Sequence, residues 1–284
     1  MGLELKNLQL DSDADVAMIR HSLLENGVVV LRSSTPYQLS RKDQADFTQK
    51  LGDVIKLPAS FAGNDPEPVF SEIQRVTNYW SNGTFKGPQH CFGCYWHKDG
   101  NFQHNDYLAS ILYADEVDGA SLESTGTWFL DNCATYGLME NSLKHAIDGN
   151  TMFVSVRDIP DFQNGPEEDY ALFPIAARHN VFYKHPGNNR DCVYLTGQLI
   201  TEKEQSEGQK KSLEKAWEFM TEASPLYKHE WKKGDIVIWD NLAVMHRRSP
   251  KVNSDTISKS RRMMFRTQCH LGKSTRGKYG GSTF

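Results

Sequence analysis

Short apolar runs, each bounded by turn-forming residues, dominate the chain from residue 108 onward. They occupy residues 108–114, 127–130, 181–184, 193–196, 236–239 and 263–269. Runs of this length, rich in β-branched and aromatic residues, are typical of strands. No regular alternation of strands with helices accompanies them, which argues against a Rossmann or α/β-barrel fold. The pattern favours an antiparallel β-sandwich or jelly roll.

Helical patterns lie before and after most of these runs. Apolar residues recur at helical spacing over residues 14–25, and that pattern stops at Asn26-Gly27 before the β-branched strand 28–31. Further helices are expected over residues 43–51 and 202–221. The sequence has no repeat, low-complexity tract or obvious linker. We therefore expect a single domain over residues 1–284, mainly β with helices.

Charge, apolar content and cysteine usage limit the classes of partner. The formal net charge of −4 does not favour binding to nucleic acid. No apolar run approaches the roughly 18 residues of a membrane span, and the N-terminal residues lack the pattern of a signal peptide. Five cysteines, an odd count in a chain of 284 residues, indicate a reduced, cytoplasmic protein without a disulfide framework.

A His-x-Asp motif gives the first indication of a metal site. His97 and Asp99 would point to one face of a strand, and Lys98 to the opposite face. His246, which follows an apolar run and a polar turn, can supply a third ligand. Two histidines and one carboxylate leave positions open for non-haem Fe(II) and dioxygen chemistry, whereas a structural zinc site uses four protein ligands. Taken alone, His-x-Asp is a weak signal, because such a pair is more often hydrogen-bonded in a loop than bound to a metal.

The context of this motif resembles the taurine- and chlorophenoxyacetate-type dioxygenases, members of the Fe(II)/2-oxoglutarate oxygenase superfamily. The matching motifs follow the family's order over about 170 residues. They are Trp96-His97-x-Asp99-x-x-Phe102, Gly126-Thr127-Trp128-Phe129, Lys184-His185-Pro186 with Tyr194, Trp239-Asp240-Asn241 with His246, and Arg261-Arg262-Met263-Met264-Phe265-Arg266.

The resemblance implies a double-stranded β-helix (jelly roll) with Fe(II) at one open end, bound by His97, Asp99 and His246. It implies an oxidoreductase that acts on a small-molecule substrate with dioxygen and 2-oxoglutarate, releasing succinate and CO2. The carboxylate at position 99 favours hydroxylation, desaturation or ring closure over halogenation, because halogenases of this superfamily lack it.

The resemblance also implies a binding site for the far carboxylate of 2-oxoglutarate. The first arginine of the last motif, Arg262, falls on the family's position for this role, and the hydroxyl of Thr127 assists it. Arginine suits the role because its planar fork forms two hydrogen bonds to a carboxylate. The segment between His246 and Arg262 is longer than usual, with an insertion at residues 253–255, so Arg261 stays an alternative.

The second arginine of that motif, Arg266, matches the residue that binds the substrate's anionic group in these enzymes. We therefore expect an anionic, partly apolar substrate, with Phe102 and Tyr95 shaping its pocket. The competing interpretation pairs Arg266 with an acid such as Asp240. Core packing is the alternative for the aromatic residues, and we favour it for Trp96.

Other metal-binding residue types have simpler explanations. Cys91-x-x-Cys94 could be half of a zinc site or a redox pair, but no second such motif accompanies it. Three further histidines are expected to be structural: His104, His179 and His185. Gly93 stands where the taurine enzyme has a polar substrate ligand, which argues against taurine itself.

Two alternatives remain open from the sequence. The first is a non-catalytic, cupin-like jelly roll that binds a metal as a binding or sensor protein, which would need the three ligands but not Arg262 and Thr127 together. The second concerns the outcome of the reaction, because hydroxylation, desaturation, oxidative cyclisation and epimerisation share the same hydrogen-abstraction step. A homo-oligomer is also compatible with the sequence.

Overall fold

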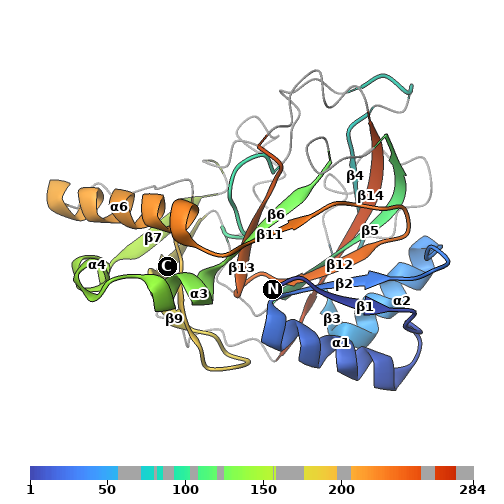
Figure 1. Cartoon of the computed structure of the whole chain (residues 1–284), viewed down its shortest axis with the longest axis horizontal. Helices are drawn as coiled ribbons and strands as arrows, with labels where there is room; N and C mark the ends of the chain where they lie inside the picture. Colours follow the sequence, from blue (N-terminus) through green and yellow to red (C-terminus); the bar gives the residue numbers. More distant parts are fainter. Residues whose placement is uncertain are drawn as a thin grey trace.

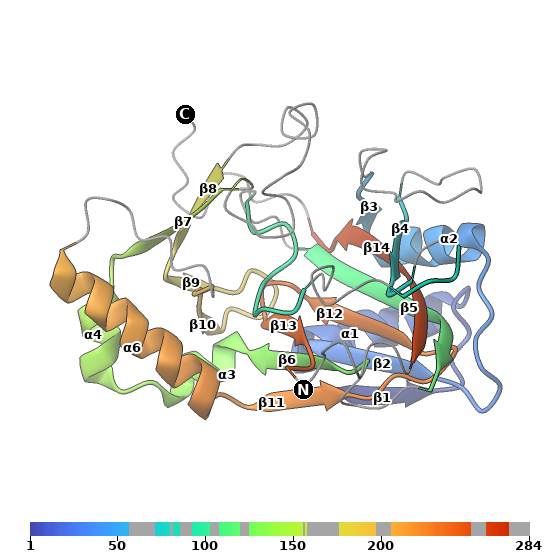
Figure 2. The same cartoon turned by 90° about the horizontal axis from the view of Figure 1, so that it is seen from above.

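Two main β-sheets, two further pairs of strands and the helices around them form the part of the chain that the structure describes (Figures 1 and 2). This computed structural model describes residues 1–56, 72–79, 82–85, 93–102, 108–119, 125–155, 157, 176–196, 206–250 and 260–272. Strands outnumber helices within these residues. The expected mainly β fold with helical additions is confirmed.

The larger sheet has its described strands in the order β1-β2-β12-β5-β14-β3, and β4 also pairs with β14. All of its pairings are antiparallel except that of β1 with β2. The bounds are β1 (Leu3–Lys6), β2 (Val28–Arg32), β3 (Asp53–Val54), β4 (Gln74–Thr77), β5 (Leu108–Asp118), β12 (Ile236–Asp240) and β14 (Arg261–His270). The pairing of β5 with β14 contains a bulge between Met263 and Met264.

The smaller sheet has the order β11-β6-β13 and is antiparallel. Two hairpin-like pairs, β9 with β10 and β7 with β8, complete the described strands. The bounds are β6 (Thr127–Asp131), β7 (Thr151–Ser155), β8 (Ala176–Asn180), β9 (Phe182–Lys184), β10 (Asp191–Val193), β11 (Leu226–His229) and β13 (Val244–Arg248). A connection of three residues, 241–243, joins β12 of the larger sheet to β13 of the smaller one.

The helices fall into two groups at opposite ends of the molecule (Figure 1). Helices α1 (Asp13–Asn26) and α2 (Arg41–Leu51) cover one face of the larger sheet, whereas α3 (Asn132–Leu138), α4 (Asn141–Ile147) and α6 (Glu207–Ala223) lie together beside the smaller sheet. The expected stop of α1 is confirmed, because Gly27 takes a left-handed φ of 69° there. No described helix has the length and apolar character that crossing a membrane requires.

The two faces of the larger sheet belong to different cores. On the outer face, Ile111, Ile238 and Phe265 pack against α1 and α2. On the inner face, Val237 and Met264 pack with residues of the smaller sheet. This alternation follows from the two-residue period of a strand. It also places Arg262 and Arg266, which are two residues on either side of Met264, on the inner side.

One expectation from the cysteine count is wrong. Cys133 in α3 and Cys192 in β10 form a disulfide, with 4.0 Å between their Cα atoms. The two cysteines are 59 residues apart in sequence, and only the packing of α3 against β10 brings them together. Number and spacing of cysteines alone could not have indicated this contact. Cys269 is a free, buried cysteine.

Candidate metal centre

Three ligand-type side chains converge where the smaller sheet faces the larger one. One potential ligand atom each from His97, Asp99 and His246 lies within 4.8 Å of the others. His97 and His246 are held side by side by reciprocal backbone hydrogen bonds of 3.0 and 2.9 Å. The segment with His97 forms this isolated bridge rather than the strand expected from the sequence, yet it presents both His97 and Asp99 to the same point.

Hydrogen bonds orient the first two side chains of this cluster. The ring Nδ1 of His97 lies 2.8 Å from the Tyr95 carbonyl oxygen, which leaves Nε2 free to bind a metal. Asp99 accepts a hydrogen bond of 2.6 Å from the Ser110 hydroxyl at Oδ2 and one of 2.5 Å from Arg266 at Oδ1. The carboxylate is therefore fixed from the larger sheet, on which Ser110 and Arg266 lie.

The environment favours the protonation states that a metal requires. Burial raises the pKa of Asp99, but the positive charge of Arg266 and the two histidines outweigh it and bring that pKa to about 2. Burial, followed by the proximity of His97, lowers the pKa of His246 to about 3. An ionised carboxylate and a neutral imidazole are thus the stable forms at neutral pH, and both are ligand forms.

The donor set fits a divalent iron ion. Two imidazole nitrogens and one carboxylate oxygen converge from one side, which leaves the other side open to further ligands. The buried Nδ1 of His246 has no hydrogen-bond partner among the described residues. A buried polar nitrogen without a hydrogen-bond partner is unusual in proteins, and a bound ion or ligand is one explanation for it.

Arg262 and Arg261 have opposite environments, which separates the two alternatives for the cosubstrate carboxylate. Arg262 is 4% exposed, and its Nη1 donates to the Thr125 carbonyl at 3.1 Å. Arg261 lies on the other face of β14, where it forms a surface ion pair of 2.9 Å with Glu116. Of these two arginines, therefore, only Arg262 directs its charge into the interior.

A second cation that sequence reasoning missed lies near Arg262. Arg248 follows the ligand His246 by two residues on β13 and pairs in register with Thr127. Burial lowers the pKa of Arg248 to about 10, and burial together with the charge of Arg248 lowers the pKa of Arg262. Two neighbouring buried cations are a suitable environment for an anion. The sequence signal would have been the alternation of His246 and Arg248 along one strand.

Thr127 is buried beside the same region, at 5% exposure. Its hydroxyl oxygen accepts a hydrogen bond of 2.9 Å from the indole nitrogen of Trp231. The hydroxyl hydrogen therefore remains available to a second partner.

Arg266 reaches a metal ligand rather than the acid considered from the sequence. Its Nη1 contacts Asp99 Oδ1, whereas Asp240 is bound by His185 through a buried contact of 2.9 Å. The structure thus pairs Arg266 with an acid, as the alternative expects, but the acid is Asp99 and not Asp240. The guanidinium therefore lies against a carboxylate of the candidate ligand cluster.

The aromatic candidates differ in their positions. The Tyr95 ring lies 5.1 Å from the His97 ring, so it borders the metal centre. Phe102 is 6% exposed. Trp96 packs against buried apolar side chains that include Leu130, Val193 and Met245, which confirms its structural role.

Gly93 leaves no room for a side chain beside the metal centre. Its φ is +70°, and a Cβ built there would lie 2.9 Å from the His97 ring. The polar substrate ligand that the taurine enzyme has at this position is therefore absent from the chain.

The remaining histidine and cysteine candidates are structural or undescribed. His185 binds Asp240, and His179 lies 2.7 Å from the Asn101 carbonyl and stacks on Tyr194. Neither belongs to the ligand cluster, as expected. His104 and Cys91 lie outside the described residues.

Comparison with known proteins gives the same family along the whole described fold. The model of the "Taurine catabolism dioxygenase TauD, TfdA family" matches residues 2–268. An alpha-ketoglutarate-dependent 2,4-dichlorophenoxyacetate dioxygenase of Burkholderia sp. (strain RASC) is 23% identical, over 86% of this chain and 84% of the relative. Pentalenolactone F synthase of Streptomyces avermitilis is 24% identical, over 82% of this chain and 80% of the relative.

Solved structures of similar chains share the double-stranded β-helix fold. AAD-2 in complex with Mn(II) and N-oxalylglycine superposes with a TM-score of 0.73 at 20% identity, covering 96% of this chain and 95% of that one. A taurine dioxygenase from Burkholderia xenovorans gives a TM-score of 0.72 at 20% identity, covering 98% and 90%. The chain therefore belongs to the TauD, TfdA family of dioxygenases, enzymes that depend on Fe(II) and 2-oxoglutarate.

Proposed function

We propose that His97, Asp99 and His246 bind the Fe(II) ion, and that Arg262 and Thr127 bind the far carboxylate of 2-oxoglutarate. The observation that carries this proposal is the convergence of three ligand atoms within 4.8 Å, held by backbone hydrogen bonds to β13 of the smaller sheet and by Ser110 of the larger one. A buried Arg262 on the inner face of β14 supports the cosubstrate assignment. We add Arg248 to the same anion site, because its charge acts on Arg262.

In this proposal the bound iron supplies the activation of dioxygen at the expense of 2-oxoglutarate. The chain's own residues supply binding and orientation. His246 stays neutral as a ligand, and Asp99 stays ionised beside Arg266. Arg262 neutralises the cosubstrate's charge in a pocket with little access to water.

The substrate we propose is small, anionic and partly apolar, with its anionic group on Arg266. The guanidinium lies at the metal centre, and the Tyr95 ring lies beside His97; Phe102 is the second aromatic candidate for this pocket. The relatives' names support this class, since 2,4-dichlorophenoxyacetate joins a carboxylate to a chlorinated ring. The outcome is abstraction of a substrate hydrogen followed by hydroxylation, desaturation or cyclisation.

We further propose one domain over residues 1–284, in a cytoplasmic protein that binds neither nucleic acid nor membrane. The net charge of −4 supports the first of these exclusions. The Cys133–Cys192 bond is an argument against the cytoplasmic location, because disulfides are rare in cytosolic proteins. Cell fractionation combined with thiol labelling tests the location, and light scattering tests whether the chain forms a homo-oligomer.

Anaerobic spectroscopy tests the cofactor assignment. We expect Fe(II) plus 2-oxoglutarate to give a weak visible charge-transfer band with the metal-free protein. The band should be absent from His97→Ala and His246→Ala, and present in the control His145→Ala, whose side chain is exposed on α4. A wild-type protein that binds metal without the band would instead support a non-catalytic, cupin-like jelly roll.

A further inference from the structure

Lys98 lies between two ligand candidates, His97 and Asp99, and is almost fully buried, at 2% exposure. Its side chain points away from the ligand cluster, as the alternation of a strand predicts. The Nζ atom donates to the Tyr183 hydroxyl at 2.9 Å and to the Leu242 carbonyl at 3.3 Å. It also lies 4.5 Å from the centre of the Tyr194 ring.

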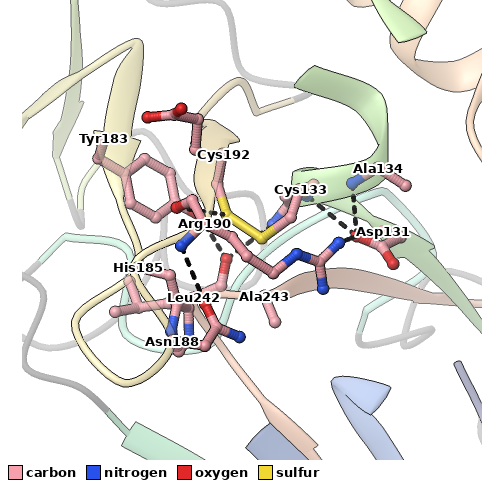
Figure 3. Close-up of a disulfide and its surroundings, with 12 residues drawn as sticks. Asp131, Cys133, Ala134, Tyr183, His185, Asn188, Arg190, Cys192, Leu242 and Ala243 are labelled. Carbon is pink, nitrogen blue, oxygen red and sulfur yellow. Dashed lines mark hydrogen bonds and ion pairs between the residues drawn. A yellow bond between two sulfur atoms is a disulfide. The ribbon is translucent and has the colours of Figure 1, made fainter. Parts of the chain in front are cut away.

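The Leu242 carbonyl is a meeting point of three hydrogen-bond donors. Besides Lys98, it accepts from the Asn132 side chain at 3.1 Å and from the Tyr183 hydroxyl. Figure 3 shows Tyr183 and Leu242 next to the Cys133–Cys192 bond. That disulfide links the helix that begins at Asn132 to the strand paired with Tyr183.

Leu242 lies in the turn of residues 241–243, and a carboxylate accepts hydrogen bonds from the backbone N–H groups of this turn. Asp240 Oδ1 accepts from the backbone nitrogens of Leu242 and Ala243, at 2.9 and 3.1 Å. Its Oδ2 is fixed by His185. Leu242 thus has a carboxylate oxygen of Asp240 at its N–H and the Nζ atom of Lys98 at its C=O, so side chains hold both of its backbone polar groups.

This turn determines where the third ligand lies, because it connects β12 to β13 and β13 carries His246. The segment with the other two ligands is tied to it at successive positions. His97 pairs with His246 through the backbone, and the Asp99 nitrogen donates to the Asn241 side chain at 3.2 Å. Between these two contacts, Lys98 adds a third, its hydrogen bond to the Leu242 carbonyl.

Burying the polar amine of a lysine is costly unless it is hydrogen-bonded, and a methionine would fill the same space without that cost. The hydrogen bonds from Nζ to Tyr183 and Leu242 are therefore what a lysine adds at this position. We propose that Lys98 is a positioning residue that, through the Leu242 carbonyl, holds the segment with His97 and Asp99 in register with His246. The inference rests on the proposed metal-binding function and concerns a residue that touches neither metal nor substrate.

Metal binding to the purified full chain tests this role without any turnover. Mn(II) affinity is measured by the EPR signal of the free ion, and ligand geometry by the visible absorption of the Co(II) form. For Lys98→Met we expect a Kd for Mn(II) at least tenfold above wild type, as for other residues that orient metal ligands, and an altered Co(II) spectrum. Tyr183→Phe, which removes one donor to Leu242, should change both in the same direction to a smaller extent.

Lys184→Met is the matched control, because Lys184 lies on the same hairpin as Tyr183 but forms an exposed ion pair with Asp191. It should bind Mn(II) within twofold of wild type. The inference is overturned if Lys98→Met binds Mn(II) as tightly as wild type with an unchanged Co(II) spectrum. If Lys98→Met does not fold, Tyr183→Phe decides: a raised Kd supports the role, and an unchanged Kd overturns it. Wild-type protein that binds neither ion would contradict the proposed function itself.

Discussion

At the scale of single residues, the centre depends on which way adjacent side chains on β14 point. Arg261 pairs with Glu116 at the surface, whereas Arg262 and Arg266 enter the interior. The two interior arginines are four residues apart, which on a strand corresponds to roughly 13 Å. Such a separation allows one strand to bind two anions at once, the cosubstrate's far carboxylate and the substrate's anionic group.

Replacing Arg266 by alanine should raise the substrate KM by about 10- to 100-fold, the effect of losing a charge-assisted hydrogen bond of about 1.5–3 kcal/mol. The substrate used is the aryl or alkyl carboxylic acid that turns over fastest in a product-mass survey. Arg261→Ala, on the opposite face of the same strand, should keep its KM. Since Arg266 also contacts Asp99, the Mn(II) affinity is measured in parallel. A changed metal affinity with an unchanged KM would contradict the substrate role.

At the scale of secondary structure, the sequence predicts best those elements that carry their own signals. Helix α1 has an N-cap at Ser12 and a left-handed glycine at its end, and strand β12 is a continuous apolar run. Strand β4 (Gln74–Thr77) has no such signal and is extended because it pairs with β14. Likewise, β11 is a strand through its pairing with β6. Tertiary context, which a local pattern does not contain, determines these elements.

The same distinction applies to the site. His-x-Asp spacing suggested one face for His97 and Asp99, but it could not place His246, which follows them by about 150 residues, without the family resemblance. The roles of Arg248 and Lys98 depend on which groups the fold brings near them. No periodicity in the sequence expresses that proximity.

The disulfide between α3 and β10 gives a prediction at this scale. Replacing Cys133 and Cys192 together by alanine should lower the free energy of unfolding by about 2–4 kcal/mol, because the bond closes a long loop in the unfolded chain. Urea denaturation of the oxidised wild type and of the double variant provides the comparison. The slope of the unfolding free energy against urea concentration is checked to be the same in both proteins. Equal midpoints in both proteins would show that the bond does not contribute to stability.

At the scale of the whole molecule, a buried charged cluster joins the two sheets at the end away from the α6 group. Asp235, at 1% exposure, is bound by Arg32 of β2 at 2.6 Å and lies 3.2 Å from His229 of β11. Burial raises the pKa of Asp235, but the hydrogen bonds from Arg32 and the proximity of His229 outweigh it and lower that pKa. Burial is the main reason that the pKa of His229 is lowered.

Both groups therefore stabilise the fold more above their ordinary pKa values than below them. We expect the unfolding free energy of the metal-free protein to fall as the pH drops below about 6.5, where His229 would be protonated in the unfolded chain, and again below about 4 for Asp235. His229→Gln should flatten the first decrease, and Asp235→Asn should lower stability by about 3 kcal/mol at pH 7. Asp191→Asn, at an exposed ion pair, serves as the control and should change stability little. A flat profile from pH 7 to 4 would contradict the assignment.

The centre itself spans the interior between the two layers. His246 belongs to the smaller sheet, whereas Ser110 and Arg266, which fix Asp99, belong to the larger one. Any ligand bound by these residues contacts both layers at once. Its binding therefore adds to the free energy of unfolding, since the layers can separate only after the ligand has been released. An enzyme of this architecture becomes more resistant to unfolding by the same event that prepares it for its reaction.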